Sequence, residues 1–169
     1  MNMKKIIVMV LLLLPLGMVA QEMKIAVVKA NDIIQQMPEF TEMQNELEKL
    51  QNQFQKEMKS FEDDYTRKYQ DLMSQQDSLP ENIYKVRVQD IQQTQMRMEN
   101  FQQLATTEIE KKQNELFTPI QDKLQKAIDQ VGEENGYTLM LVYNPGIILY
   151  MGKSAIDATS QVKAKLGLK

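Results

Sequence analysis

Residues 40–72 read FTEMQNELEKLQNQFQKEMKSFEDDYTRKYQDL, and this stretch decides the fold. Its apolar residues recur every three or four positions, which is the spacing of a helix with one apolar face. They are Phe40, Met43, Leu47, Leu50, Phe54, Met58, Phe61, Tyr65, Tyr69 and Leu72. Neither glycine nor proline interrupts the stretch, so the sequence predicts one long helix.

This helix is expected to end before Pro80, and a second stretch with helical spacing follows the proline. Its apolar residues are Ile83, Val86, Ile91, Met98, Phe101, Ala105, Ile109 and Leu116. If the chain folds back at the proline, apolar residues face one another at nearly every step. The facing pairs include Met43 with Leu116, Met58 with Phe101 and Phe61 with Met98, while Tyr69 faces Asp90 as a mismatch. The sequence therefore predicts an antiparallel coiled-coil helical hairpin, an arm over residues 39–117 with its tip near 74–81.

The segments on either side of the arm contain short strand-forming runs. These runs are residues 24–29, 137–143 and 147–151. The last two are separated by a turn at 144–146, so they are expected to pair as strands. Residues 21–38 and 118–169 are thus predicted to form a small α+β base, and the fold as a whole is mainly α with a small β part.

Two further features of the base follow from single residues. Pro119 interrupts the returning helix, and a proline inside a helix removes one backbone hydrogen bond. We therefore expect a kink or hinge there, where the arm meets the base. Asp157 is expected to cap a last short helix over residues 158–166.

The predicted base is small for a protein core, because roughly 70 residues without a disulfide are marginally stable. Its strands are apolar on both faces, so their sheet is expected to be covered on each side. We therefore predict that the chain forms a homo-oligomer through these β-strands. The candidate interface residues are Ile25, Val27, Leu139, Leu141, Ile148 and Tyr150.

Residues 1–20 have the layout of a cleaved secretory signal peptide, with a basic start, an apolar run from residue 6 to 14 and Ala20 before the polar residues that follow. The alternative is an uncleaved membrane anchor, but the run is shorter than the ~20 residues that a spanning helix needs. Cleavage would remove two lysines, so the formal net charge would go from −3 to −5. The expected location is an envelope compartment such as the periplasm.

The composition argues against several classes of function. The chain has no Cys and no His, so it lacks thiol chemistry and the commonest general base and metal ligands. An acidic chain is also a poor candidate for binding nucleic acid. Glu62, Asp63 and Asp64 form the one acidic cluster, which we interpret as a solvated helix face because adjacent carboxylates on a helix point in different directions. We expect no enzyme activity, no cofactor and no metal site.

Several segments together resemble the Skp/OmpH family of periplasmic chaperones. They are residues 24–34, the run 42–50, Pro119-Ile120, residues 136–141, Ile148-Leu149-Tyr150 and residues 156–159. The resemblance implies a homotrimer whose arms surround a cavity, where unfolded outer-membrane β-barrel proteins are held without ATP, close to a membrane surface. The best-known members are basic, whereas this chain is acidic, which is a departure from the family pattern.

A chaperone that holds unfolded proteins would need apolar side chains that do not lie in the seam, the line along which the two helices of the hairpin pack. The candidates for client binding are Ile83, Tyr84, Met96, Leu104 and Phe117. Met58, Phe61, Met98 and Phe101 are instead interpreted as seam packing. The alternative function is a structural or adaptor protein of the cell envelope whose arm docks a folded partner. An adaptor would bind one folded protein, and a chaperone would bind many unfolded ones.

Overall fold

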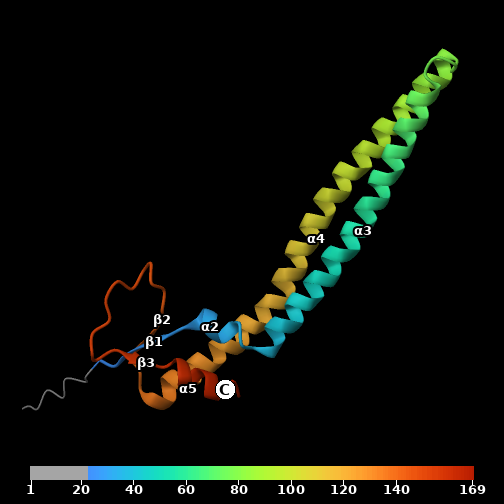
Figure 1. Cartoon of the computed structure of the whole chain (residues 1–169). Helices are drawn as coiled ribbons and strands as arrows, with labels where there is room; N and C mark the ends of the chain where they lie inside the picture. The colour runs from blue at the N-terminus through green and yellow to red at the C-terminus, as the bar shows by residue number, and fades with distance from the viewer. Residues whose placement is uncertain (1–22) are drawn as a thin grey trace, which may run out of the picture.

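A computed structural model describes residues 23–169, so the predicted signal peptide lies outside the described residues. The elements are β1 (Ile25–Val28), α2 (Ala30–Ile34), α3 (Pro38–Gln75), α4 (Glu81–Asn135), β2 (Leu139–Val142), β3 (Ile156–Asp157) and α5 (Thr159–Lys165). α3 and α4 run side by side as a long arm that projects from a small base of strands and short helices (Figure 1). The predicted fold class, a long antiparallel helical hairpin on a small α+β base, is confirmed.

The arm consists of two uninterrupted helices. α3 has 38 residues, which corresponds to about 57 Å at ~1.5 Å per residue. Pro38 stands in its first turn, where a missing N–H leaves no helical hydrogen bond unmade. At the far end, the N–H groups of Ser78 and Leu79 donate to the carbonyl of Gln75, at 3.0 and 3.1 Å, and α4 starts directly after Pro80.

Aromatic contacts define how the two helices of the arm face each other. The ring of Phe101 on α4 makes edge-to-face contacts with Phe61 and Phe54 on α3, with ring centroids 5.3 and 5.8 Å apart. The sequence placed Met58 opposite Phe101, and Met58 lies midway between these two phenylalanines along α3. The predicted pairing of the helices therefore agrees with the structure to within one helical turn.

The returning helix α4 passes through Pro119 without ending and continues to Asn135. Thr118, the residue before the proline, turns its hydroxyl back onto the helix and donates to the carbonyl of Asn114 at 2.8 Å. α4 ends where Gly136 adopts a left-handed conformation with φ of 63°, which glycine reaches without steric cost.

The sheet differs from the predicted strand pair. Its order is β2-β1-β3, and both pairings are parallel, with Ile25 beside Leu139 and Ala26 beside Ile156. The prediction that residues 147–151 form a strand is wrong. The N–H groups of Ile147 and Ile148 both donate to the carbonyl of Asn144, at 2.9 and 2.8 Å, so the turn uses donors that a strand would need. The third strand is β3 instead, which lies on the other side of β1.

Helices cover one face of this sheet and form the core of the base. Ala26 and Val28 on β1 pack with buried residues of three helices. Those residues are Ala30 and Ile33 of α2, Leu124, Ala127 and Val131 of α4, and Val162 of α5, with Ala158 just before α5. A second cluster of Met37, Met43 and Ile120 lies where the arm joins the base, and Leu166 and Leu168 pack against it. The C-terminal end of the chain therefore connects the base to the arm.

Within residues 23–169, no helix lies on the other face of the sheet, and the segment after β2 covers part of it. Leu139 and Leu141 on β2 are 46% and 40% exposed. Full cover on this face would have to come from another copy of the chain, so the predicted covering of both faces stays a prediction. Across residues 23–169, no helix combines the length and the apolarity that crossing a bilayer requires.

Candidate functional site

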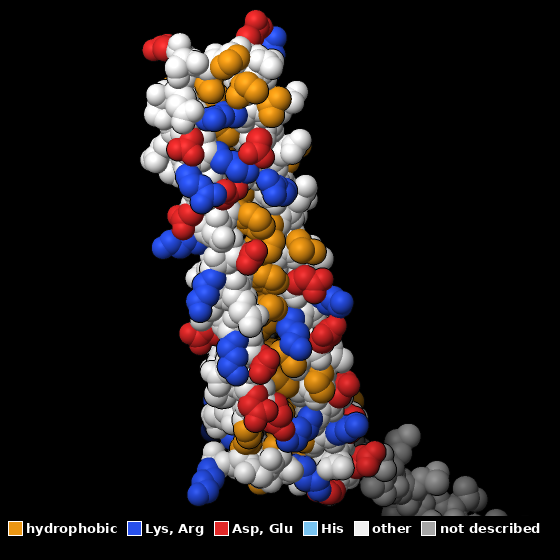
Figure 2. Space-filling model, turned by 90° about the vertical axis from the view of Figure 1, so that its right-hand side faces the viewer, with side chains coloured by type: hydrophobic (Ala, Val, Ile, Leu, Met, Phe, Trp, Pro, Cys, Tyr) orange, Lys and Arg blue, Asp and Glu red, His pale blue; other side chains and the backbone are white. Residues whose placement is uncertain are grey.

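The surface of the arm carries apolar side chains in an elongated stripe between charged ones, with a further group near the tip (Figure 2). The exposed large apolar residues of the arm are Tyr69, Met73, Ile83, Val86, Met96 and Leu104. Exposed apolar groups that form a continuous patch mark surfaces on which proteins or membranes bind. The arm is therefore the first candidate for a binding surface.

The five residues that the sequence proposed for client binding differ in how exposed they are. Met96 and Leu104 are 54% and 53% exposed, and Ile83 near the tip is 41% exposed. Tyr84 is half-buried. Phe117 is also half-buried and packs against the cluster at the arm's junction with the base, so it is the least accessible of the five.

An apolar groove of about 660 Å³ runs between α3 and α4 in the middle of the arm. Phe54, Met58, Met98 and Phe101 line it, together with Ala105 and Ile109. Glutamine side chains form much of its rim, from Gln51, Gln55, Gln95 and Gln102, and Glu62 and Glu99 add two carboxylates. The methionines and phenylalanines interpreted as seam packing are thus half-buried rather than fully enclosed. Flexible thioether side chains of this kind adapt readily to different partners.

The face of the sheet opposite the helices forms a second apolar site. A cavity of about 250 Å³ lies between the sheet and the segment after β2. It is lined by five of the six residues proposed for oligomerisation, Ile25, Val27, Leu141, Ile148 and Tyr150. Leu139, the sixth, lies beside Ile25 on β2. Tyr150 is 86% exposed, and Val27 is 3% exposed because the neighbouring segment covers it.

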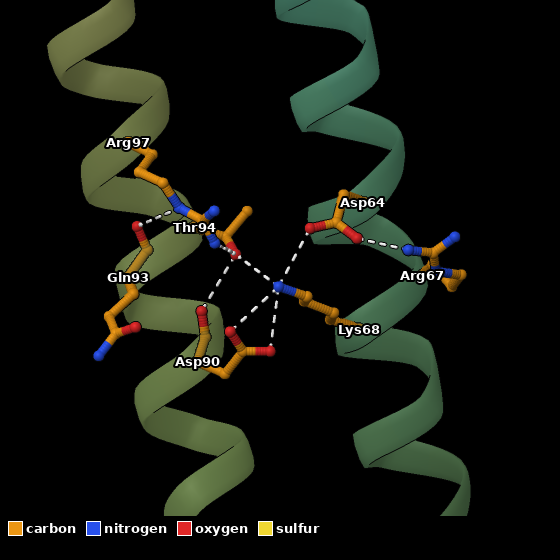
Figure 3. A network of polar contacts seen from close by, with 7 residues as sticks. All are labelled: Asp64, Arg67, Lys68, Asp90, Gln93, Thr94 and Arg97. Atoms are coloured by element: carbon orange, nitrogen blue, oxygen red, sulfur yellow. Dashed lines mark hydrogen bonds and ion pairs between the residues drawn. The ribbon is translucent and has the colours of Figure 1, made fainter.

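A polar cluster crosses the seam toward the distal part of the arm (Figure 3). Lys68 on α3 forms ion pairs with Asp64 on its own helix and with Asp90 on α4, and it donates to the hydroxyl of Thr94. The hydrogen bond that Lys68 donates to Asp90 raises the pKa of Lys68, and the one that it donates to Asp64 lowers the pKa of Asp64. Sequence reasoning missed this cluster. The mismatch of Tyr69 with Asp90 was its one signal, because a carboxylate facing the seam needs a cation nearby.

A second ion pair joins α3 to α4 near the base. Lys123 on α4 donates to the carboxylate of Glu39 on α3, and this hydrogen bond lowers the pKa of Glu39. The pair lies beside Pro119, so it fastens the two helices where the hinge was predicted. Within residues 23–169, no three acidic side chains come close enough together to hold a metal ion.

Asp157 caps α5 from the position before its N-cap residue, Ala158, as the Oδ1 of Asp157 accepts a hydrogen bond from the N–H of Thr159 at 2.9 Å. Contacts with the hydroxyl and the N–H of Thr159 lower the pKa of Asp157 below its usual 3.8. A carboxylate with a lowered pKa stabilises the fold at neutral pH, and this stability is lost as the pH falls through the lowered pKa. The same segment holds β1, because the N–H of Lys29 donates to the hydroxyl of Thr159 at 3.0 Å.

Asp157→Ala is therefore expected to lower the free energy of unfolding by about 1 kcal/mol at pH 7, the usual cost of a lost N-cap. Below the lowered pKa, the difference between the variant and the parent should shrink, because the parent's carboxyl is then protonated. Urea unfolding over a series of pH values from 7 downward follows this decrease. Asp157→Asn is the control, since asparagine caps equally well without titrating; equal losses in both variants would contradict the capping role.

A helical hairpin with an apolar groove, standing on a small parallel sheet, defines the chain as an arm-bearing hairpin protein. The model of the family described as Outer membrane protein (OmpH-like) matches residues 24–166, and the chain belongs to this OmpH-like family. The resemblance noted in the sequence is thereby confirmed. No curated protein matches the chain in sequence.

A solved structure of an OmpH-like protein from Caulobacter crescentus CB15 has the same fold. The two structures align with a TM-score of 0.72 over 85% of this chain and 83% of that one. Their sequences are 13% identical, so the likeness concerns the fold. The arm on a small base is thus an arrangement that very different sequences adopt.

Proposed function

We propose that the chain is a periplasmic holdase chaperone that binds unfolded outer-membrane β-barrel proteins without ATP and keeps them from aggregating. The observation that carries this proposal is the pair of exposed apolar side chains, Met96 and Leu104, on an arm that also bears a methionine-lined groove. Many weak apolar contacts suit an unfolded client, because such contacts require no defined partner shape. Membership of the OmpH-like family supports the same function.

The second part of the proposal concerns assembly. Leu139 and Leu141 are exposed on the face of the sheet opposite the helices. Burying them between copies of the chain would enlarge a core that is small for a single chain. We propose a homotrimer built through this face, as the family resemblance implies. Residues 21–38 and 118–169 would form its body, and the arms, residues 39–117, would enclose the cavity for the client.

The proposal extends to export and to arm movement. Removal of residues 1–20 as a signal peptide would deliver the chain to the periplasm, near the membrane into which its clients insert. Pro119 would act as the hinge at which an arm moves to fit clients of different size, because the backbone there lacks one hydrogen bond. The proposal includes no catalytic step and no cofactor.

The test is the dilution of a urea-unfolded outer-membrane β-barrel protein into buffer without ATP, with and without the chain lacking residues 1–20. We expect turbidity to be suppressed near one oligomer per client, for several unrelated clients. Unimpeded aggregation of all clients would overturn the holdase proposal. Capture of a single folded envelope protein would favour the structural adaptor instead.

Met96→Gln combined with Leu104→Gln is expected to weaken client holding by about tenfold, since losing ~1.4 kcal/mol of apolar contact changes affinity by a factor of ten. The two residues are exposed, so the arm itself should keep its stability. The measurement is the concentration of chain that halves client turbidity. Gln92→Ala with Gln103→Ala is the matched control, as both positions are exposed on the same helix. Equal effects of the two double variants would contradict the role of the apolar pair.

A further inference from the structure

The polar cluster across the seam is unlike the rest of the arm's interior. Thr94 on α4 is fully buried, and in the part of the chain that the structure describes it is the one buried residue with a polar side chain. Its nearest partner from α3 is Lys68, whose side chain is only 24% exposed. Burial of such groups is costly unless each donor and acceptor is satisfied.

The ammonium group of Lys68 is fully satisfied. It has three donors, and three side chains accept them: Asp64 at 3.1 Å, Asp90 at 3.0 Å and Thr94 at 3.0 Å. Asp64 belongs to α3, whereas Asp90 and Thr94 belong to α4 (Figure 3). A single side chain therefore fixes the position of one helix against the other.

The hydroxyl of Thr94 is satisfied as well. It donates to the carbonyl of Asp90 at 3.0 Å, and it accepts hydrogen bonds from Lys68 at 3.0 Å and from Arg97 at 3.1 Å. A hydroxyl offers one donor and two acceptor positions, so nothing is left unused. A polar network in which every member is satisfied stiffens a core and favours one packing arrangement.

The rest of the seam does not select one arrangement so strictly. Apolar residues on α3 recur every three or four positions along the whole helix, so a shift by one turn again brings apolar groups together. In the shifted arrangement, however, Lys68 would lose Asp90 and Thr94 on α4 and keep only Asp64 on its own helix, so its half-buried ammonium group would lack two of its three partners. Buried polar residues in coiled coils are known to fix the helix register in this way, at some cost in stability.

We propose that the Lys68–Asp90–Thr94 cluster is a register lock, which selects one axial alignment of α3 and α4 from the several that the apolar seam permits. The lock determines which side chains line the groove and which stand exposed on the arm. It therefore positions the binding surface without contacting a client, and it does not depend on what the arm binds.

The decisive variant replaces all three residues by apolar ones: Lys68→Met and Thr94→Val roughly keep the side-chain size, and Asp90→Ala removes a carboxylate that is about half exposed. Asp64 keeps Arg67 as its partner, so no carboxylate loses every cation. Because a buried polar network contributes little net stability, the helical signal and the thermal midpoint should stay equal or rise. What should change is the alignment of the two helices.

Alignment can be measured by electron spin resonance between two spin labels, and a chain without Cys allows clean labelling. The labels are placed at Gln70→Cys on α3 and Gln113→Cys on α4, both exposed positions. Asp90 marks the level of Gln70 on the opposite helix, because it pairs with Lys68. Gln113 lies 23 residues further along α4 than Asp90. The labels are thus offset along the arm by about 35 Å, and a shift of one turn changes their distance by roughly 5 Å. Labelled chain is mixed with excess unlabelled chain, so that only distances within one chain are recorded.

The parent should give one narrow distance distribution, and the triple variant should give a second population shifted by about one turn. Thr94→Ser keeps the hydroxyl and should retain the single distribution. Lys85→Met is the matched control, because Lys85 pairs with Glu81 on its own helix only. A single unshifted distribution in the triple variant would overturn the proposal. Loss of helix in that variant would also overturn it, because the cluster would then supply stability rather than register.

Discussion

Leu141→Asp is expected to separate the proposed trimer into single chains. Leu141 is 40% exposed on the open face of the sheet, so a single chain can hold the carboxylate in contact with water. In the proposed trimer, each copy would instead bury this charge without a partner, and an unpaired buried charge costs several kcal/mol. Repeated in three copies, that cost exceeds what an ordinary interface can offset. Sedimentation velocity should therefore record the mass of one chain in place of three.

Leu104→Asp is the matched control for this prediction. It introduces the same charge at an exposed leucine on the arm, far from the sheet. The control should sediment like the parent at the same concentration. If Leu141→Asp also sedimented like the parent, the open sheet face would not be the surface through which the copies meet.

Ile33→Ala is expected to lower the free energy of unfolding by about 2–5 kcal/mol, the usual cost of removing a large buried aliphatic side chain. Ile33 is fully buried in the core cluster of the base, between the sheet and the helices that cover it. Domains of this kind are stable by only ~5–15 kcal/mol, so the loss would be a large share of the total. Urea unfolding at a fixed protein concentration measures it, because the stability of an oligomer depends on concentration.

Ile147→Ala makes the same chemical change at a residue that is 76% exposed. Its effect should stay within about 0.5 kcal/mol, as for most surface substitutions. Similar losses at both positions would mean that the cluster around Ile33 is not the core that holds the base together.

The arm could be predicted from the sequence because its information is local. Helical spacing over Phe40 to Leu72 sets the first helix, and Pro80 sets its reversal. The facing pairs followed from simple alignment, and the contact of Phe61 with Phe101 agrees with them to within a turn. The helices depended on neighbours three or four residues apart, and their pairing followed once Pro80 fixed where the chain turns back.

The base could not be predicted as well, because its pairings are not local. Residues 147–151 have the composition of a strand, yet Asn144 accepts two backbone hydrogen bonds and holds them in a turn. β1 instead pairs with residues more than a hundred positions away, at Leu139 and Ile156. Composition gives the tendency to form a strand, but it does not identify the partner.

The candidate residues illustrate the same limit at the level of side chains. Met96 and Leu104 are exposed, whereas Phe117 with similar apolar character packs at the arm's junction with the base. The difference arises from α5 and the end of the chain, whose Leu166 and Leu168 contact that junction. Thr94 was missed because a threonine on a helix surface and one in a seam look alike until its partners are located.

The central position of β1 in the sheet determines the order in which the parts of the chain can fold during synthesis. β1 is among the first segments synthesised after residue 22, yet both of its neighbours lie after residue 138. The hairpin arm can fold from local contacts as soon as its two helices exist, whereas contacts between distant segments form late. A chain whose synthesis stopped before Ile156 would carry an arm without a finished sheet. The three-stranded sheet, and with it the face through which the proposed trimer would assemble, is therefore expected to form only after Ile156 has been synthesised.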